Sequence, residues 1–506
     1  MRSKKALINT FTAILCEIVT IICSFILPRL ILSSFGSSYN GITSSITQFI
    51  SCIVLLRAGV GGVTRAALYK PLADKNTNEL SQIIKATEIF MKKVSLLFAA
   101  FLVVFAAIYP VFVNSEFDWI FSFSLVLILG ISTFAQNYFG ITYQILLQAD
   151  QKKYVLSWLT IVTTILNTIV ASVLILAGAS IHIVKLGSAI VFTLNPLFLN
   201  YYVKKSYHLD VLATPNNAAI SQRWDAFAQQ VAAFVNNNTD IMVLTVFCNL
   251  KEISVYTVYH MVANGLYKIE NTVCDGIEAA FGNMLAKDEE QLLHKNFRMF
   301  ELLVFSTSTF LFVCGGLLIV PFVMVYTKGI TDVSYSRPVF GALMCINQFL
   351  FCIRLPYHML TDAAGEFKRT RNGAIFESFM NVVISVVLVF KFGLIGVTVG
   401  TFCALFFRTM QYSVFASKNI LKRSMKVVIK RIIISVMEAG SVVANVHYLP
   451  VVETVSYLTW LLEAIKVGCV SLGIILVYSV VFFNDELRNL VEKIGSLLVK
   501  AKKKKQ

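Results

Sequence analysis

The sequence predicts an all-α polytopic membrane protein, on three observations. First, 57% of the 506 residues are hydrophobic and only 14% are charged, whereas a typical soluble protein is about a quarter charged. Second, the mean hydropathy is +0.73, and apolar runs of about 20 residues, long enough to cross a bilayer as a helix, recur along the chain. Third, basic residues gather in alternate connections between these runs. We therefore expect about 14 transmembrane helices.

The predicted spans follow one another with short polar connections. Their approximate cores are 7–33, 43–67, 94–113, 119–147, 154–178, 182–203, 226–247, 254–285, 299–326, 339–361, 372–391, 394–417, 427–446 and 458–483. The longest inner connection splits the core into spans one to six and spans seven to twelve, so both halves enter the membrane from the same side, as in transporters built from parallel repeats. We expect two six-helix lobes around a central cavity plus a C-terminal helix pair. The expected boundaries are 1–204 for the first lobe, 205–225 for a cytoplasmic linker, 226–418 for the second lobe and 419–506 for the helix pair with its basic tail.

The distribution of Lys and Arg predicts the orientation. Of the 44 basic residues, 32 lie in the terminal segments and connections that share a side with the N-terminus, 4 lie in the opposite connections and 8 lie inside spans. Connections rich in Lys and Arg stay in the cytoplasm, so both termini are expected there. The tail sequence KAKKKK predicts contact with anionic membrane lipids rather than with nucleic acid.

No motif in the sequence predicts catalysis or a cofactor. HExxH, GxSxG and Walker sequences are absent, and the six histidines are scattered. The ten cysteines form no CxxC pair, so we expect neither a zinc site nor a disulfide framework. A carrier is favoured over an enzyme, and no metal is expected.

Four cations share a similar depth inside predicted spans. Arg57, Lys268, Arg354 and Arg408 each lie 14 or 15 residues from the outer end of their span, roughly 21–23 Å below the outer face at 1.5 Å per residue. Cations at one level, from both lobes, predict sites for an anionic substrate in a cavity. A structural bridge between helices is the alternative. Arg29 lies near the outer end of its span and can either join this set or extend to the interface.

Fewer acids lie inside the spans. We single out Glu17, Asp240, Asp275 and Glu377. A buried carboxylate can bind a cation or take a proton and so couple transport to a Na⁺ or H⁺ gradient or to the membrane potential, or it can neutralise a nearby arginine. Both interpretations stay open.

Three stretches resemble bacterial oligosaccharide flippases of the multidrug/oligosaccharidyl-lipid/polysaccharide exporter superfamily. Residues 35–76 contain a Tyr-x-Gly element, a span, a Gly-x-Gly element and the run LYKPLA. Residues 353–401 contain RLPYHMLTDAAG, followed by Glu-x-x-x-Asn and Gly-x-x-Gly elements. The third stretch is NNNTDIMVL, from Asn236. One position departs from the pattern, because Arg57 in LRAG stands where the resemblance predicts an acid.

The resemblance implies a bacterial inner-membrane flippase. Such a protein moves undecaprenyl-pyrophosphate-linked oligosaccharide repeat units from the inner to the outer leaflet by alternating access, for the export of capsule, O-antigen or exopolysaccharide. Arg57, Lys268, Arg354, Arg408 and Arg29 are then expected to bind pyrophosphate or sugar. The implied partners are the lipid-linked oligosaccharide, polysaccharide polymerase and glycosyltransferases. A multidrug or cation antiporter and a peptidoglycan lipid-precursor flippase are the alternatives, ahead of a membrane glycan polymerase.

Overall fold

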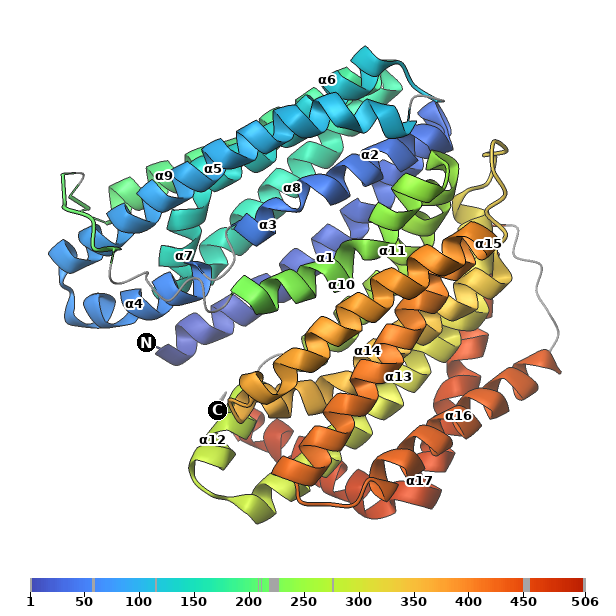
Figure 1. The fold of residues 1–506 in the computed structure, drawn as a ribbon. Helices are drawn as coiled ribbons and strands as arrows, with labels where there is room; N and C mark the ends of the chain where they lie inside the picture. Colours follow the sequence, from blue (N-terminus) through green and yellow to red (C-terminus); the bar gives the residue numbers. More distant parts are fainter. Residues whose placement is uncertain are drawn as a thin grey trace. The chain divides into compact units, whose positions relative to one another are not determined.

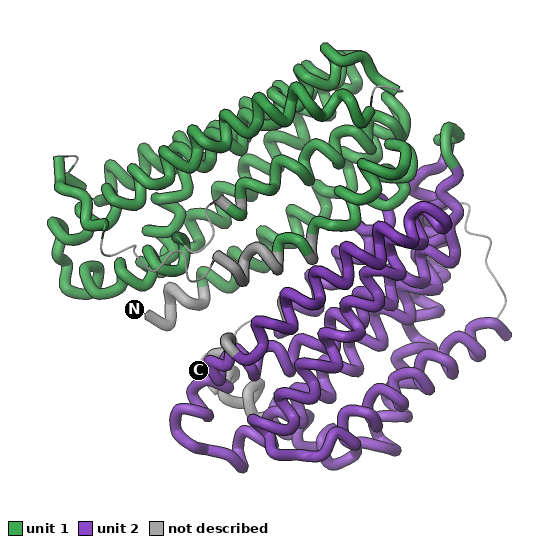
Figure 2. The backbone as a smooth tube through the Cα atoms, in the orientation of Figure 1, with its two compact units in different colours: residues 1–257, 329–333 green, residues 258–328, 334–506 purple. Residues whose placement is uncertain are grey.

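The chain folds into helices, and no strand occurs among the residues that the structure describes (Figure 1). The structure is a computed structural model. It describes residues 2–56, 60–113, 116–207, 209–210, 212–217, 227–274, 277–448 and 456–503. Two compact units are present, one of residues 1–257 and 329–333 and the other of residues 258–328 and 334–506 (Figure 2). The predicted lobe boundary at 205–225 stays a prediction.

Unit 1 holds the helices of the first half of the chain. They are α1 (Arg2–Phe35), α2 (Ser37–Ile50), α3 (Ile53–Leu56), α4 (Val60–Asp74), α5 (Thr77–Val113), α6 (Trp119–Ala135), the π-helical turn η1 (Gln136–Gly140), α7 (Ile141–Ala149), α8 (Lys153–Leu176), α9 (Ile181–Ser206), α10 (Phe227–Phe247) and the start of α11 (Leu250–Cys274). α8 packs between α1 and α9, and α6 packs between α5 and α9.

A close backbone contact joins α2 to the α10–α11 corner of unit 1. A Cβ atom added at Gly41 would lie 1.9 Å from the carbonyl oxygen of Leu250, so only glycine fits there. Buried hydroxyl and amide groups meet along the same helix. Asn40 donates to Ser254 Oγ at 2.9 Å, and Ser45 shares a 2.8 Å hydrogen bond with Thr245. Small and polar groups of this kind hold helices together in a membrane, where lipid removes the hydrophobic drive.

Unit 2 is built around α13. Its helices are the rest of α11, α12 (Ile277–Ala286), α13 (Glu290–Tyr326), α14 (Pro338–Ala363), α15 (Phe367–Phe415), the π-helical turn η3 (Ala416–Ile420), α16 (Lys426–His447) and α17 (Tyr457–Lys503). α13 packs against α14 on one side and against the α16–α17 pair on the other, and α14 packs against α15.

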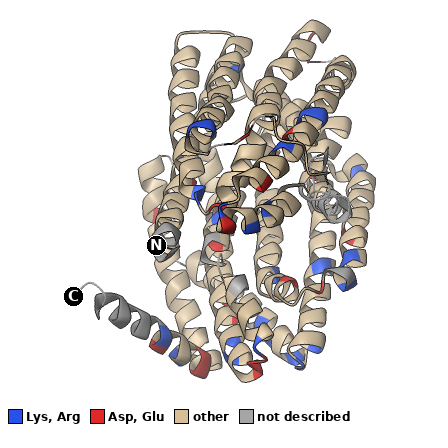
Figure 3. Ribbon diagram, turned by 90° about the vertical axis from the view of Figure 1, so that its left-hand side faces the viewer, with Lys and Arg blue, Asp and Glu red and all other residues tan. Residues whose placement is uncertain are grey.

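The structure confirms the predicted fold class. Each of the fourteen predicted spans coincides with a helix or a short series of helices. Within the described residues, nine helices are long and apolar enough to span a membrane by themselves. Large apolar side chains lie exposed on these helices, among them Val111, Leu176 and Phe390, and charged residues are sparse along them (Figure 3). The protein is therefore a multi-pass membrane protein.

A predicted span is interrupted by a turn that the hydropathy pattern does not reveal. The span predicted at 43–67 contains α2 and α3, which a turn at Ser51 and Cys52 separates, and the start of α4; the residues between α3 and α4, and those between α11 and α12, lie outside the described part of the chain. The spans predicted at 372–391 and 394–417 form the two halves of α15, on either side of the non-helical residue Gly393. Apolar sequence keeps its hydropathy through such breaks, because hydropathy does not depend on backbone conformation.

Candidate functional site

The kink in α15 creates a helical hairpin within unit 2. Gly393 has φ 52° and ψ −126°, a backbone conformation that glycine adopts without strain. The two halves of α15 then pack closely, since a Cβ atom added at Gly400 would lie 2.2 Å from Ser385 Oγ. Glu377 and Arg408 lie 16 residues before and 15 residues after Gly393. The hairpin therefore places these two side chains opposite each other.

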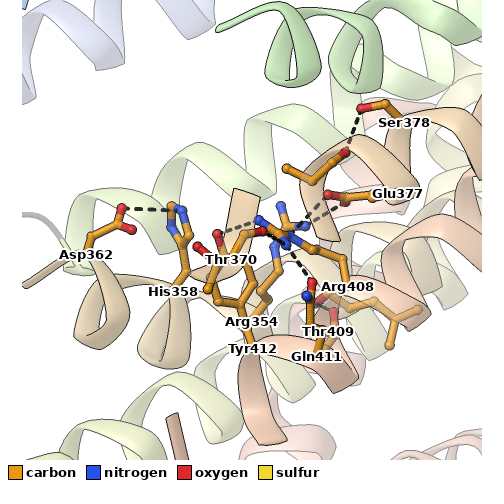
Figure 4. Close-up of polar contacts among 12 residues, drawn as sticks. Arg354, His358, Asp362, Thr370, Glu377, Ser378, Arg408, Thr409, Gln411 and Tyr412 are labelled. Carbon is orange, nitrogen blue, oxygen red and sulfur yellow. Dashed lines mark hydrogen bonds and ion pairs between the residues drawn. The ribbon is translucent and has the colours of Figure 1, made fainter. Parts of the chain in front are cut away.

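Glu377 lies between two arginines from different helices (Figure 4). Its Oε1 atom is 2.9 Å from Arg354 Nη1, on α14, and its Oε2 atom is 3.4 Å from Arg408 Nε. All three residues are buried, with 9%, 5% and 4% of the surface exposed for Arg354, Glu377 and Arg408. The site thus joins α14 to both halves of α15.

Further polar and aromatic groups surround the Arg408 guanidinium. Its Nη1 atom donates to the carbonyl oxygen of Thr370 at 2.8 Å and to Gln411 Oε1 at 2.5 Å, and its Nη2 atom donates to Tyr412 Oη at 2.8 Å. The guanidinium carbon also lies 4.1 Å from the centroid of the Tyr412 ring, a cation–π distance. Arg354 has fewer partners and lies 4.3 Å from the ring centroid of Phe351.

The charges of this cluster do not balance. An arginine side chain keeps its charge in proteins, so two fixed positive charges share the single carboxylate of Glu377. His358 and Asp362, 3.4 Å apart on the last turns of α14, lie beside Tyr412, whose ring is 5.0 Å from the His358 ring. Chemically, the Arg354–Glu377–Arg408 cluster can hold helices together and can attract one further anionic group.

The remaining predicted site residues fall in different places. Lys268 is partly buried on α11 of unit 2, and Arg29 is partly buried on α1 of unit 1. Glu17 is exposed on α1, and Asp240 accepts a 2.8 Å hydrogen bond from Tyr256 Oη within unit 1. Arg57 and Asp275 lie outside the described residues. A substrate role for any of these residues stays a prediction.

A second buried charge network was not predicted. Glu301, on α13, is fully buried and accepts hydrogen bonds from Arg423 Nη1 at 3.0 Å and from Arg431 Nε at 2.9 Å. Tyr357 Oη also donates to Glu301, and Arg431 Nη2 lies 3.1 Å from Glu486 on α17. Here two arginines meet two carboxylates, so the network is balanced, and it attaches the α16–α17 pair to α13.

The sequence does hold a signal for this second network. Glu301 lies three residues into a predicted span and Arg431 lies five residues into another, so both are expected near the same membrane face. Arg431 belongs to the basic segment 418–431, so a count of charges in the connections does not distinguish it from exposed lysines. A carboxylate and an arginine at matching depths in two spans are candidates for a pair even when the helices are far apart in the sequence.

Comparisons with known proteins identify the fold. No family model and no curated protein matches the sequence. Among solved structures, the chain is similar to the lipid II flippase MurJ in an inward closed conformation, with a TM-score of 0.67 and 15% identity over 95% of this chain and 100% of that chain. It is similar to an inward-facing MATE family transporter of the MOP superfamily, with a TM-score of 0.59 and 12% identity over 79% and 95%. A eukaryotic MATE transporter gives a TM-score of 0.58 and 12% identity over 82% and 95%.

These similarities establish the architecture of the chain. Each sequence identity is below 25%, and at this level structural similarity establishes the fold and not the function. The chain has the fold shared by MurJ and the MATE transporters of the MOP superfamily, which confirms the predicted resemblance in fold. The proteins that share this fold are flippases and transporters rather than enzymes.

Proposed function

We propose that this protein is a flippase that carries lipid-linked oligosaccharide repeat units, linked through undecaprenyl pyrophosphate, from the inner to the outer leaflet of a bacterial cytoplasmic membrane. The observation that carries the proposal is the flippase fold over 95% of the chain. A sugar and a pyrophosphate cannot cross hydrocarbon unaided, whereas a polyprenyl tail can stay in the lipid. Alternating access of two lobes moves the polar part while the tail follows outside.

The Arg354–Glu377–Arg408 cluster supports an anionic substrate. Its single carboxylate leaves one positive charge uncompensated among the three residues, and arginine binds phosphate oxygens through two parallel hydrogen bonds. Arg354 is the residue we assign to substrate contact, because Arg408 is already surrounded by Thr370, Gln411 and Tyr412. Arg57, Lys268 and Arg29 are proposed to contribute further positive charge. The coupling energy is proposed to come from the membrane potential or a Na⁺ or H⁺ gradient.

Display of surface glycan tests the proposal directly. In cells that depend on this chain for the glycan, Arg354→Gln and Arg57→Gln should lower display at least about tenfold, the loss expected when a charged hydrogen bond of about 1.5–3 kcal/mol disappears. The matched control is Arg369→Gln, which removes an exposed arginine from the same helix as Glu377. Normal display by both test variants at unchanged protein level would refute the assignment of these residues.

A peptidoglycan lipid-precursor flippase is the second candidate, because the similar structure of MurJ, with a TM-score of 0.67, is that of a lipid II flippase. Expression in cells depleted of their own lipid II flippase distinguishes the two. Restored growth favours the peptidoglycan precursor, and restored glycan display without growth favours the oligosaccharide. A change in drug susceptibility alone would favour the multidrug antiporter, and a change in glycan chain length alone would favour a polymerase.

A further inference from the structure

The α16–α17 helix pair carries a pocket that the proposed transport cycle does not use. Its volume is about 420 Å³, within the range of pockets that hold drug-sized ligands. The lining is apolar over most of its length, from Ile429, Ile433 and Met437 on α16 and Phe482 on α17, and Lys426 and Lys430 line it as well. These six residues and Ile434, which completes the lining, belong to unit 2.

The lining residues are sorted along the helix by polarity. Lys426 and Lys430 are one turn apart at the start of α16, and Ile433 and Met437 continue the same face toward the other end. From Lys426 to Met437 the helix rises roughly 16 Å at 1.5 Å per residue. One leaflet of a hydrocarbon core of about 30 Å is about 15 Å thick. The pocket therefore has a cationic end and an apolar length that match one leaflet lipid.

The positive charge at this end is available to a ligand. Within the described part of the chain, no carboxylate lies at ion-pair distance from Lys426 or Lys430. The adjacent Arg431 differs, because its side chain turns inward and is held by Glu301 and Glu486 at 2.9 and 3.1 Å. Lys430 instead lies 5.4 Å from the ring centroid of Phe483. The two neighbouring basic residues therefore differ: Arg431 pairs with acids inside the protein, whereas Lys430 faces outward.

The apolar end is open to its surroundings. Ile429, Ile433 and Met437 are 50%, 53% and 47% exposed. Because α16 coincides with the span predicted at 427–446, these side chains are expected to meet acyl chains, and a soluble ligand would have to displace lipid to reach them. Charge and position together select a lipid with a negative headgroup.

We propose that this pocket binds one anionic phospholipid, with the headgroup phosphate at Lys426 and Lys430 and an acyl chain along Ile433 and Met437. The proposal does not depend on the transported substrate. Because Glu301 fixes α16 and α17 to α13 through Arg431, the bound lipid would lie against a preformed surface. Each lysine near a membrane surface favours anionic lipid. From the two lysines together we expect a preference of at least roughly tenfold.

Native mass spectrometry of the full chain tests the proposal. Purified protein in detergent is supplied with equal amounts of phosphatidylglycerol and phosphatidylcholine, and lipids retained on the folded protein are counted. We expect one phosphatidylglycerol retained roughly tenfold over phosphatidylcholine. The double variant Lys426→Gln, Lys430→Gln should lose this preference, whereas Lys204→Gln, Lys205→Gln, a pair of exposed lysines at the end of α9, should keep it.

A second variant separates the pocket from general surface charge. Met437→Trp fills the apolar end without changing charge, and it should also abolish the retained phosphatidylglycerol. Equal retention of both lipids by the unmodified protein would overturn the proposal, as would an unchanged preference in the lysine variant. Preferential retention of undecaprenyl phosphate over phosphatidylglycerol would also overturn it. Lipids are counted only on folded protein, and the two lipids are compared within the same spectrum. Poor folding of a variant therefore lowers both signals and cannot imitate the expected loss of preference.

Discussion

Two groups of buried arginines in unit 2 meet carboxylates in different ratios. At one of them, two arginines, Arg423 and Arg431, meet two carboxylates: both contact Glu301, and Arg431 also contacts Glu486. At the other, Glu377 is the one carboxylate, among the described residues, at ion-pair distance from Arg354 and Arg408. Removing one partner from a buried pair is costly because the other charge is left uncompensated. The ratio therefore decides which substitution damages the fold and which damages only the binding of an anion.

This ratio gives a prediction for single substitutions at the three-residue cluster. Glu377→Gln leaves two buried arginines without a counter-charge and should destabilise the protein by about 3–5 kcal/mol. Arg354→Gln leaves Glu377 and Arg408 as a neutral pair and should cost clearly less. Thermal unfolding of the purified variants measures the difference, with Glu366→Gln, in a more exposed pair with Arg369, as control. Equal stability of the Glu377 and Arg354 variants would contradict the charge count.

At the scale of the element, the α15 hairpin explains why these residues meet. Its turn depends on Gly393, where φ is 52° and a Cβ atom would meet no atom within 4 Å. A side chain added at this position would therefore cause strain only through the backbone conformation and not through a steric clash. Gly393→Ala should destabilise the protein by about 1–3 kcal/mol, the usual cost of a residue held in a rarely populated backbone region.

The control for this turn is Gly473→Ala. Gly473 lies inside α17, also with open space around it, so alanine there should leave stability unchanged or raise it by up to about 1 kcal/mol. Thermal unfolding compares the two variants. A Gly393 variant as stable as the Gly473 variant would show that the hairpin turn tolerates other residues and that another feature holds the two halves together.

The sequence predicts helices well and their mutual positions poorly. Length and hydropathy locate each span because the bilayer requires about 20 apolar residues. The partner of Arg354 could not be found at helical spacing, because Glu377 lies on the next helix, 23 residues away. The proximity of Glu377 to Arg408 is predictable once the chain is taken to reverse direction at Gly393, because the two residues lie at nearly equal distances from it in the sequence. The turn between α2 and α3 leaves no mark in hydropathy, since it depends on backbone torsions and on packing.

At the scale of the whole molecule, the orientation predicted from the charges leads to a test. Ser424 lies between η3 and α16, and Ser456 lies between α16 and α17. The 22 residues of α16 span about 33 Å, slightly more than a hydrocarbon core of about 30 Å. The two serines should therefore lie on opposite faces of the membrane, with Ser456 outside if the basic connections are cytoplasmic.

Labelling with a membrane-impermeant maleimide decides this orientation. In intact cells Ser456→Cys should react and Ser424→Cys should react only after permeabilisation. The unmodified protein supplies the background. Its Cys248, predicted near the outer face, should add little signal at neutral pH, because burial and the nearby Glu252 raise the pKa of this thiol to about 11 and only the thiolate is nucleophilic. The reverse pattern would place both termini outside, and the basic tail would then face the wrong leaflet for a role in cytoplasmic lipid contact.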